Sequence, residues 1–378
     1  MSASVDSDNL DIESPSQLSA WLKKSGYVSE DENLTVSTLS GGVSNRTVLV
    51  ERSNGDRWVL KQALEKLRVR VDWFSSPNRI HREALGIRWL TLLAPESTVP
   101  ELIFEDQQHH LIGMQAVPMP CETWKTMLLK GTIIPDHFRQ FGQILGTIHS
   151  RSALMNQAEA SETAGTVDDD NRERLSQLFS DTQFFESLRL EPYYSYTSTQ
   201  VPEAASFIEV LLEETRAVRT SVVHGDYSPK NILVHQDQLH LIDHEVIHFG
   251  DPAFDIGFAM THLLSKYHHL IPNRPVLTEL IPLFVSAYRT AASAEIERCM
   301  TERASPAFEP EYLVPEQRSV RHTLACLLAR VRGRSPLEYL SEPERGRQQR
   351  MVLSLMRDCP RTLNELVSRW RTLCNETA

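Results

Sequence analysis

Hydrophobic and polar positions follow two different patterns in the first quarter of the chain. Apolar residues at helical spacing predict a short helix that begins at Ser14-Pro15 and ends at Gly26. Beyond it, apolar and polar residues alternate as they do in strands, and an Asn-Gly turn joins two of the runs. The predicted strands cover residues 34–39, 47–51 and 57–62.

A second helix is predicted over 78–93, where apolar residues recur every three or four positions. Two more strand-like runs follow, at 101–105 and 110–115. The first part of the chain therefore reads as a small β-rich unit with few helices.

Prolines at 118 and 120 mark a change to mainly helical patterning, of which 139–149 is the clearest early case. The polar segment 155–171 is predicted as a surface loop. One short non-helical stretch, 222–243, interrupts the helical part. We therefore predict a disordered tail at 1–13, an N-terminal lobe at 14–117 and a C-terminal lobe at 118–378.

Composition and charge narrow the class of partner. The chain has 378 residues, of which 41% are hydrophobic and 24% charged, so it can bury a sizeable core. A net charge of −11 argues against nucleic acid or an anionic membrane as the main partner. Five scattered cysteines without a Cys-x-x-Cys pair, and a polar start without an apolar segment, predict a reduced, cytoplasmic protein.

The stretch 222–243 carries the clearest chemistry. Asp226 and Asn231 lie five residues apart on a loop that leads into a strand, and Asp243 ends the partner strand of the same hairpin. Paired strands bring the two ends of a hairpin together, so Asn231 and Asp243 are expected side by side with Asp226 next to them. Two oxygen ligands suit Mg²⁺, and a further carboxylate can orient a hydroxyl and take its proton.

The combination of His224-Gly225-Asp226 with Asn231, Asp243 and a following Gly-Asp-Pro-Ala-Phe-Asp run resembles the aminoglycoside phosphotransferase and choline kinase superfamily. The resemblance implies an α+β, protein-kinase-like two-lobed fold, with a small antiparallel-sheet N-lobe and a larger, mainly helical C-lobe. It also implies that Asp226 is the catalytic base, that Asn231 and Asp243 bind Mg²⁺, and that His224 and Asp255 support the loop.

Methylthioribose kinases are similar in one further respect, because an Asp-x-Glu takes the place of Asp-Phe-Gly here. This likeness implies that Glu245 is an extra metal ligand. It also implies a substrate role for Arg330, although a solvated charged helix face explains the arginines near 330 equally well. Asn231 departs from the serine expected in that subgroup, which leaves membership of the subgroup open.

The N-lobe offers candidate nucleotide ligands. Lys61 lies inside an apolar strand and is either a solvated residue or a phosphate ligand, and Glu83 lies on the side of the next helix that packs on the sheet. In kinases such a pair holds the nucleotide phosphates. A Gly-Gly turn between two strands lets backbone amides approach phosphate, which adds Gly41, Gly42, Ser44 and Asn45. The resemblance also places adenine against the backbone near Met114 and Ala116.

These features predict an ATP- and Mg²⁺-dependent phosphotransferase acting on a hydroxyl of a small molecule. The acceptor stays open between an aminoglycoside, an amino sugar, methylthioribose and a choline-like alcohol, and the oligomeric state is not predicted. Two alternatives remain. A kinase-like regulatory scaffold would have lost catalytic residues that are present here, and a protein kinase needs more than the eleven residues between Asp243 and Asp255 for an activation loop.

Overall fold

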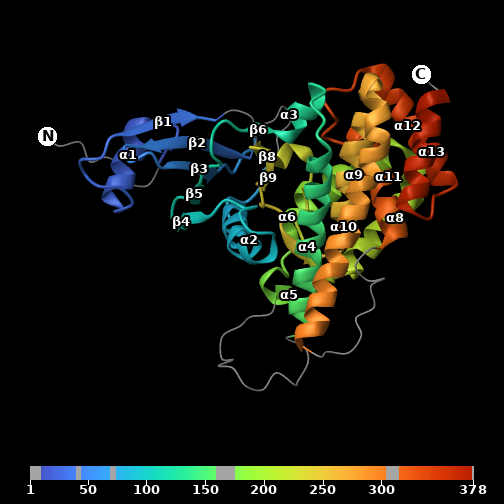
Figure 1. The fold of residues 1–378 in the computed structure, drawn as a ribbon. Helices are drawn as coiled ribbons and strands as arrows, with labels where there is room; N and C mark the ends of the chain where they lie inside the picture. Colours follow the sequence, from blue (N-terminus) through green and yellow to red (C-terminus); the bar gives the residue numbers. More distant parts are fainter. Residues whose placement is uncertain (1–9, 40–43, 69–73, 159–174, 304–314, 377–378) are drawn as a thin grey trace. The chain divides into compact units, whose positions relative to one another are not determined.

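The computed structural model describes residues 10–39, 44–68, 74–158, 175–303 and 315–376 (Figure 1). The chain divides into two compact units. Unit 1 comprises Met1–Thr91 and Val99–Met119, and unit 2 comprises Leu92–Thr98 and Pro120–Ala378. The assignment of nucleotide-binding and catalytic roles to two lobes stays a prediction.

Unit 1 is built on a five-stranded antiparallel sheet with the order β1-β2-β3-β5-β4. Its strands are β1 (Leu34–Thr38), β2 (Asn45–Arg52), β3 (Arg57–Ala63), β4 (Leu102–Asp106) and β5 (Leu111–Gln115). The Asn54-Gly55 turn joins β2 to β3, and Gly55 has the positive φ of 92° that such turns require. The alternation of apolar residues thus predicted these strands to within about two residues at each end.

One face of this sheet packs against α1 (Pro15–Lys24), which Gly26 follows with a φ of 74°. The core between them contains Leu18 and Leu22 from the helix, and also Leu10 and Ile12. The predicted disordered tail at 1–13 is therefore wrong for residues 10–13, because Leu10 and Ile12 remove apolar surface from water here. Residues 1–9 lie outside the described residues.

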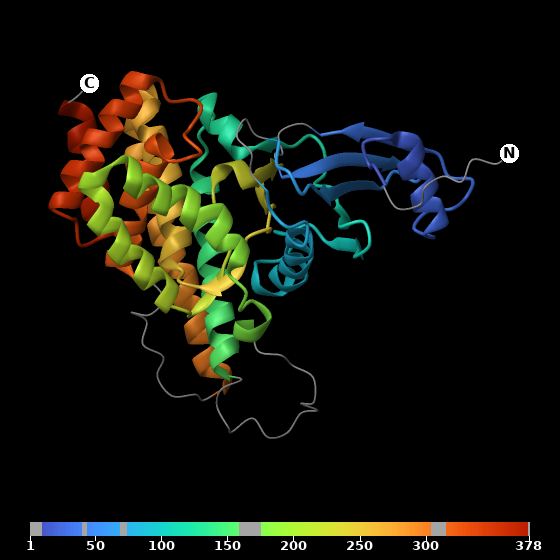
Figure 2. The ribbon, with the colours of Figure 1, turned by 180° about the vertical axis from the view of Figure 1, so that it is seen from behind.

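Unit 2 contains a pair of long helices, α4 (Pro135–Ala158) and α10 (Arg274–Arg303), that lie side by side in both views (Figure 1, Figure 2). A Cβ atom added at Gly142 would lie 2.3 Å from the Phe284 carbonyl oxygen, and one at Gly146 would lie 2.4 Å from that of Tyr288. Both distances are far below van der Waals contact. The two helices therefore approach each other this closely only because glycine occupies both positions.

The non-helical stretch of unit 2 forms two small sheets. β8 (Ile232–His235) and β9 (Gln238–Leu241) make the predicted hairpin, to which β6 (Glu122–Thr123) adds an edge strand. β7 (Ser221–Val223) pairs with β10 (His248–Gly250).

α9 (Ala253–His269) is buried along almost its entire length, and α10, α11 (Glu316–Arg332), α12 (Glu342–Arg357) and α13 (Leu363–Glu376) pack against it. α12 and α13 also pack against α11. The other helical elements are α3 (Trp124–Leu129), α5 (Leu175–Leu178), α6 (Gln183–Phe185), a π-helix over Glu186–Ser195, α7 (Tyr196–Gln200), α8 (Ala205–Ala217) and 3₁₀ turns at Pro202–Ala204, Pro229–Asn231 and Ile271–Asn273.

In unit 1, α2 (Arg79–Leu93) forms as predicted for 78–93. Residues 155–158, predicted as the start of a surface loop, instead continue α4, and the rest of that segment lies outside the described residues. Within the described ranges, none of the helices combines the length and the apolar character needed to cross a membrane.

Candidate active site

The loop that follows β7 is held by the carboxylate of Asp255, in the first turn of α9. Its two oxygens accept the backbone N–H groups of His224, at 2.6 Å, and Gly225, at 2.8 Å. Gly225 has a φ of 77°, and a Cβ there would lie 2.8 Å from a methyl carbon of Val246. A carboxylate near a helix N-terminus is favoured by the helix dipole. Asp255 therefore fixes the backbone just before Asp226, as its predicted supporting role requires.

Asp255 is itself connected to the α4–α10 pair. His149 Nε2 on α4 lies 3.3 Å from Asp255 Oδ2, and His149 Nδ1 lies 2.9 Å from the hydroxyl of Tyr288 on α10. His149 and Asp255 are completely buried. A buried carboxylate with several hydrogen-bond partners holds its position firmly. The loop is thus anchored in the core of unit 2.

Asp226 is the polar centre of this loop, with an exposed fraction of 1%. Its Oδ2 lies 2.8 Å from the Arg189 guanidinium and 2.7 Å from Lys230 Nζ, and it accepts the Asn231 side-chain N–H at 2.8 Å. Its Oδ1 is buried and has no hydrogen-bond partner among the described residues. Buried polar atoms are nearly always paired, so an orphaned carboxylate oxygen is a candidate contact for a substrate hydroxyl.

Burial alone would raise the pKa of Asp226, but the neighbouring Arg189 and Lys230 more than offset this, and the pKa lies below its ordinary value. The carboxylate is therefore ionised at neutral pH. A weak base of this kind suits phosphoryl transfer, in which orientation of the hydroxyl contributes more than early proton removal.

Asn231 is oriented by the same loop. Its side-chain nitrogen donates to the Asp226 backbone oxygen at 2.9 Å and to Asp226 Oδ2 at 2.8 Å, so its side-chain oxygen is directed elsewhere as an acceptor. The Asn231 backbone oxygen accepts the Ile242 N–H at 3.0 Å. Asp243 follows directly, and it has a φ of 72°. A non-glycine residue in that conformation costs on the order of 1 kcal/mol and occurs preferentially at functional sites.

The oxygens of Asn231 and Asp243 make a donor set that fits Mg²⁺, which takes one or two carboxylates and fills its remaining positions with water and phosphate. In the described part of the chain, no group of three or more His, Cys, Asp or Glu side chains could hold a metal ion. Glu245 is buried near Arg189, and its role as a further ligand stays a prediction.

His224 supports the loop as well. Its Nδ1 accepts the backbone N–H of Asp226 at 3.2 Å. Burial lowers the pKa of His224, so the ring is neutral at physiological pH and the other nitrogen carries the proton. Its ring stands edge-on to that of His244, with centroids 5.1 Å apart. This histidine positions the backbone, and its ring makes no hydrogen bond to the Asp226 carboxylate.

In unit 1, Lys61 on β3 and Glu83 on α2 are in contact. Lys61 Nζ lies 2.6 Å from Glu83 Oε1, and the exposed fractions of the two side chains are 11% and 1%. Lys61 faces the side of the sheet opposite to Trp58 and Leu60, which pack toward α1. The predicted strand-to-helix pair therefore exists as an ion pair, and its role in nucleotide binding stays a prediction.

The start of β2 is fixed by a completely buried arginine. Arg79 on α2 donates to the backbone oxygens of Ser44, Leu64, Ser75 and Ser76. Asn45 is buried, and its side-chain oxygen has no hydrogen-bond partner in the described structure. Gly41 and Gly42, predicted to approach phosphate, lie outside the described residues.

Met114 and Ala116 lie at the end of β5, where the adenine contact was predicted. Met114 pairs with Val59 and with Leu102 inside the sheet. The Ala116 backbone N–H donates to the Arg57 oxygen at 2.8 Å. Ala116 can therefore contact a base only as an acceptor, through its carbonyl oxygen, and the adenine assignment stays a prediction.

The arginines near 330 are not equivalent. Arg330 is buried and donates to the Tyr193 hydroxyl and to the Ser335 hydroxyl, both at 2.9 Å. Arg332 and Arg334 are more exposed and have carboxylate partners, Glu342 and Glu191. The interpretation as solvated surface charges therefore applies to Arg332 and Arg334, whereas Arg330 lies inside unit 2. Its substrate role stays a prediction.

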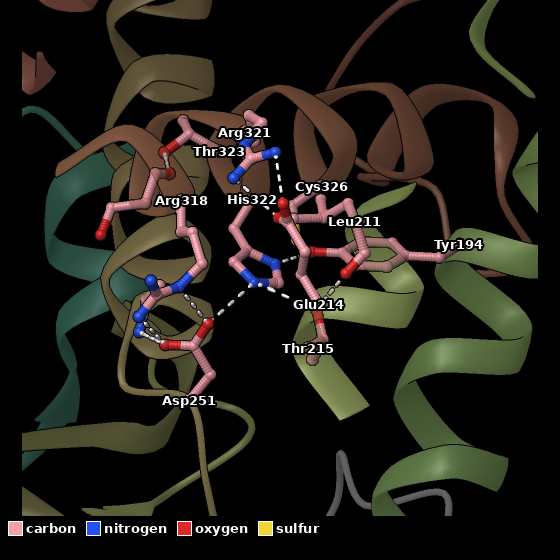
Figure 3. A network of polar contacts seen from close by, with 12 residues as sticks. Tyr194, Leu211, Glu214, Thr215, Asp251, Arg318, Arg321, His322, Thr323 and Cys326 are labelled. Atoms are coloured by element: carbon pink, nitrogen blue, oxygen red, sulfur yellow. Dashed lines mark hydrogen bonds and ion pairs between the residues drawn. The ribbon is translucent and has the colours of Figure 1, made fainter. Parts of the chain in front are cut away.

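A largely buried polar network ties α11 to Asp251, which lies between β10 and α9 (Figure 3). Arg318 Nε lies 2.8 Å from Asp251 Oδ2, and His322 Nδ1 lies 2.6 Å from the Tyr194 hydroxyl. Burial and then nearby arginines lower the pKa of His322 to about 3, so it is neutral. In Figure 3 the His322 ring lies between Asp251 on one side and Tyr194 on the other. The network braces α11 but offers no group to a reaction.

Three residues, two in unit 2 and one in unit 1, were not predicted from the sequence. Arg189 is buried on the π-helix and also donates to the Gly225 oxygen at 2.9 Å. Lys230 lies four residues after Asp226 and shares its carboxylate. Arg79 holds the start of β2 in unit 1. The position of Lys230 beside Asn231 was a usable signal, whereas Arg189 and Arg79 stand in segments without a motif.

An antiparallel-sheet unit with a paired strand lysine, followed by a helical unit with an Asp-Asn loop, defines the protein-kinase-like class of folds, as predicted. The chain belongs to the phosphotransferase enzyme family, whose model matches residues 35–277.

Methylthioribose kinases are among the similar curated proteins. Methylthioribose kinase 2 of Oryza sativa subsp. japonica is 27% identical over 248 residues, which are 62% of this chain and 57% of that protein. The methylthioribose kinase of Pectobacterium carotovorum subsp. carotovorum is 25% identical over 273 residues, 65% of this chain and 64% of that protein. The matched region thus spans less than two thirds of the length of either relative.

Solved structures are similar over most of the chain at low identity. An amicoumacin kinase has a TM-score of 0.49 and 16% identity, with coverage of 91% of this chain and 95% of that one. A fructosamine-3-kinase from Thermobifida fusca has a TM-score of 0.44 and 17% identity, with coverage of 89% and 96%.

Proposed function

We propose that this chain is an ATP- and Mg²⁺-dependent kinase that transfers the γ-phosphoryl group to a hydroxyl of a small molecule. The observation that carries the proposal is the environment of Asp226. This carboxylate is buried and ionised, shares Asn231 with the predicted metal site, and keeps one oxygen without a partner. Membership of the phosphotransferase family and the likeness to methylthioribose kinases support it.

In this proposal the residues act by positioning and by electrostatics. Asp226 Oδ1 accepts the acceptor hydroxyl and directs its oxygen at the phosphorus. Lys61, oriented by Glu83, offsets the negative charge of the nucleotide phosphates. Asn231 and Asp243 hold Mg²⁺, which when bound neutralises phosphate charge. Lys230, beside Asp226, is placed to stabilise charge on the transferred group.

A scaffold without activity is disfavoured because the Lys61–Glu83 ion pair and the Asp226 environment are both intact. An active kinase and an inactive scaffold are distinguished by thermal unfolding in the presence of nucleotide. Mg²⁺ and ATP together should raise the thermal unfolding midpoint of a kinase, because a ligand that binds only the folded state stabilises it. A scaffold that has lost nucleotide binding shows no such shift.

Lys61→Ala should raise the KM for ATP roughly 10- to 100-fold, since a hydrogen bond to a charged group contributes about 1.5–3 kcal/mol. The Mg²⁺-ATP shift of the unfolding midpoint should also disappear. Steady-state kinetics and thermal unfolding measure the two effects. Lys24→Ala, on the exposed surface of α1, is the matched control and should change neither. Wild-type ATP kinetics in Lys61→Ala would rule out a phosphate role for this lysine.

A further inference from the structure

Four cationic side chains from four different elements of unit 2 gather around His262. They are Lys125 of α3, Lys230 next to Asn231, Lys266 of α9 and Arg330 of α11. Burial is the main cause of the strongly lowered pKa of His262, and repulsion from each of these four cations lowers it further. We call these residues, with His262, the cationic cluster.

Contacts connect the same residues. Lys125 is paired with Glu338, and Lys266 faces the ring of the next residue, Tyr339. Arg330 donates to Tyr193, whose ring packs on Phe258, and Phe258 packs on His262.

The cationic cluster borders the Asp226 carboxylate. Lys230 belongs to both, because its Nζ lies 2.7 Å from Asp226 Oδ2. A second connection runs through the π-helix, on which Arg189 and Tyr193 are four residues apart. Arg189 contacts Asp226 at 2.8 Å, and the Tyr193 hydroxyl accepts a hydrogen bond from Arg330. The cluster therefore lies beside the oxygen that is proposed to receive the acceptor hydroxyl.

The charges of the cluster are not balanced within the described protein. Lys230 has Asp226 as its partner, and Lys125 is paired with Glu338. Arg330 is bonded to neutral groups only, and neither Arg330 nor Lys266 has a carboxylate at ion-pair distance among the described residues. Arg330 and Lys266 therefore lack a direct ion-pair partner in the described structure, and Glu338, which is paired with Lys125, only partly offsets their charge.

Lys266 is the more unusual of the two. Its exposed fraction is 2%, and its contacts are the His262 backbone oxygen at 3.5 Å and the Tyr339 ring, whose centroid lies 5.3 Å from Nζ. Burial first, and then Lys125 and Arg330, lower its pKa to about 7, and Glu338 offsets this only in part. Burying an ammonium group without an anion is costly, and packing alone would be served better by methionine. Buried polar atoms without a partner here include Arg330 Nε and His262 Nε2.

We propose that Lys125, Lys266 and Arg330 bind an anionic group of the acceptor, so that the substrate is a hydroxyl compound carrying a carboxylate or a phosphate. The inference rests on the proposed kinase function and specifies its substrate class. The anion supplies the counter-charge that Lys266 and Arg330 lack, while the hydroxyl of the same molecule reaches Asp226. Polycationic aminoglycosides and choline-like alcohols are disfavoured, because they would bring positive charge against positive charge.

The first test compares acceptors that share a carbon skeleton and differ in charge. Glycerol, D-glycerate and glycerol 3-phosphate form one series, and D-ribose, D-ribonate and D-ribose 5-phosphate form another. ATP consumption should proceed with a kcat/KM at least about tenfold higher for an anionic member than for its neutral counterpart. The carboxylate and phosphate members distinguish the two anions. Faster turnover of the neutral members would overturn the inference.

Substitutions test whether the cationic cluster causes the preference for anionic acceptors. Lys266→Met and Arg330→Gln should each lower the kcat/KM for the preferred anionic acceptor about tenfold or more, mainly through KM. Arg332→Gln is the matched control, because Arg332 lies on the same helix as Arg330 but is paired with Glu342 at the surface. An equal loss in all three variants, or none in the first two, contradicts the assignment.

Binding without turnover gives an independent readout. Calorimetric titration with the anionic members, at about pH 7.5 and with Mg²⁺ and a non-hydrolysable ATP analogue saturating, should show proton uptake, since an anion beside Lys266 raises its pKa from about 7. Lys266→Met should abolish the uptake. Nucleotide binding without anion binding overturns this inference and leaves the kinase proposal standing. Anion binding without phosphoryl transfer to any acceptor would overturn the kinase proposal and leave the anion-binding site standing.

The lowered pKa of Lys266 also predicts that the free energy of unfolding depends on pH. The ordinary pKa of lysine is 10.5, so between about pH 7 and 10.5 the unfolded chain binds a proton that the folded chain has released. The stability of the wild type should therefore rise with pH across this window relative to that of Lys266→Met. Urea unfolding at about pH 7 and pH 9 measures the difference. Parallel changes in the two proteins would mean that Lys266 is not buried without a counter-ion.

Discussion

Asp226→Asn should lower kcat by a factor on the order of 10³ while nucleotide binding stays close to that of the wild type. Asparagine preserves the shape of the side chain but cannot accept a proton, and a positioned general base contributes roughly 10²- to 10⁴-fold. It also leaves Arg189 and Lys230 without their carboxylate. Single-turnover phosphoryl transfer and the Mg²⁺-ATP thermal shift measure the two properties separately.

Asp237→Asn is the matched control for this substitution. Asp237 lies on the turn of the same hairpin, its side chain is 67% exposed, and its left-handed conformation is one that asparagine also adopts. Turnover in this variant should be unchanged. If the Asp226→Asn variant also had the kcat of the wild type, Asp226 could not be the group that receives the hydroxyl proton.

Asp255→Ala should destabilise unit 2 by about 3 kcal/mol and disorganise the loop before Asp226. Alanine leaves the buried N–H groups of His224 and Gly225 without acceptors, and a buried hydrogen bond to a charged group contributes about 1.5–3 kcal/mol. Urea unfolding measures the loss. Asp255→Asn should be less damaging, because one side-chain oxygen remains. Equal stability of Asp255→Ala and the wild type would show that the loop has another anchor.

The sequence predicted the parts of the site that lie on regular, locally specified backbone. The hairpin after Asn231 was recognisable because its strands are short apolar runs with a polar turn, and pairing then fixes where both ends lie. Lys61 and Glu83 were predicted as partners for a similar reason. A strand residue and a helix residue that share the interior side of one sheet must face each other.

The parts that could not be predicted depend on contacts between distant segments. Arg189 reaches Asp226 from a π-helix, whose irregular spacing gives no periodic signal, and its burial is apparent only when both segments are packed. Leu10 and Ile12 stand alone in an acidic segment, so composition predicted disorder where the core of unit 1 provides apolar partners. The cationic cluster likewise collects single residues from four elements.

The close packing of α4 against α10 has a consequence for how this protein could be altered. Gly142 and Gly146 let the helices meet, and Tyr288, opposite Gly146, is bonded to His149 and through it to Asp255. A single extra methyl group at Gly146 must displace the Tyr288 backbone. In a library selected for turnover, substitutions at these glycines should be depleted as strongly as substitutions of the reacting groups. Inhibitors that push the two helices apart should likewise abolish activity without binding at the Asp226 loop.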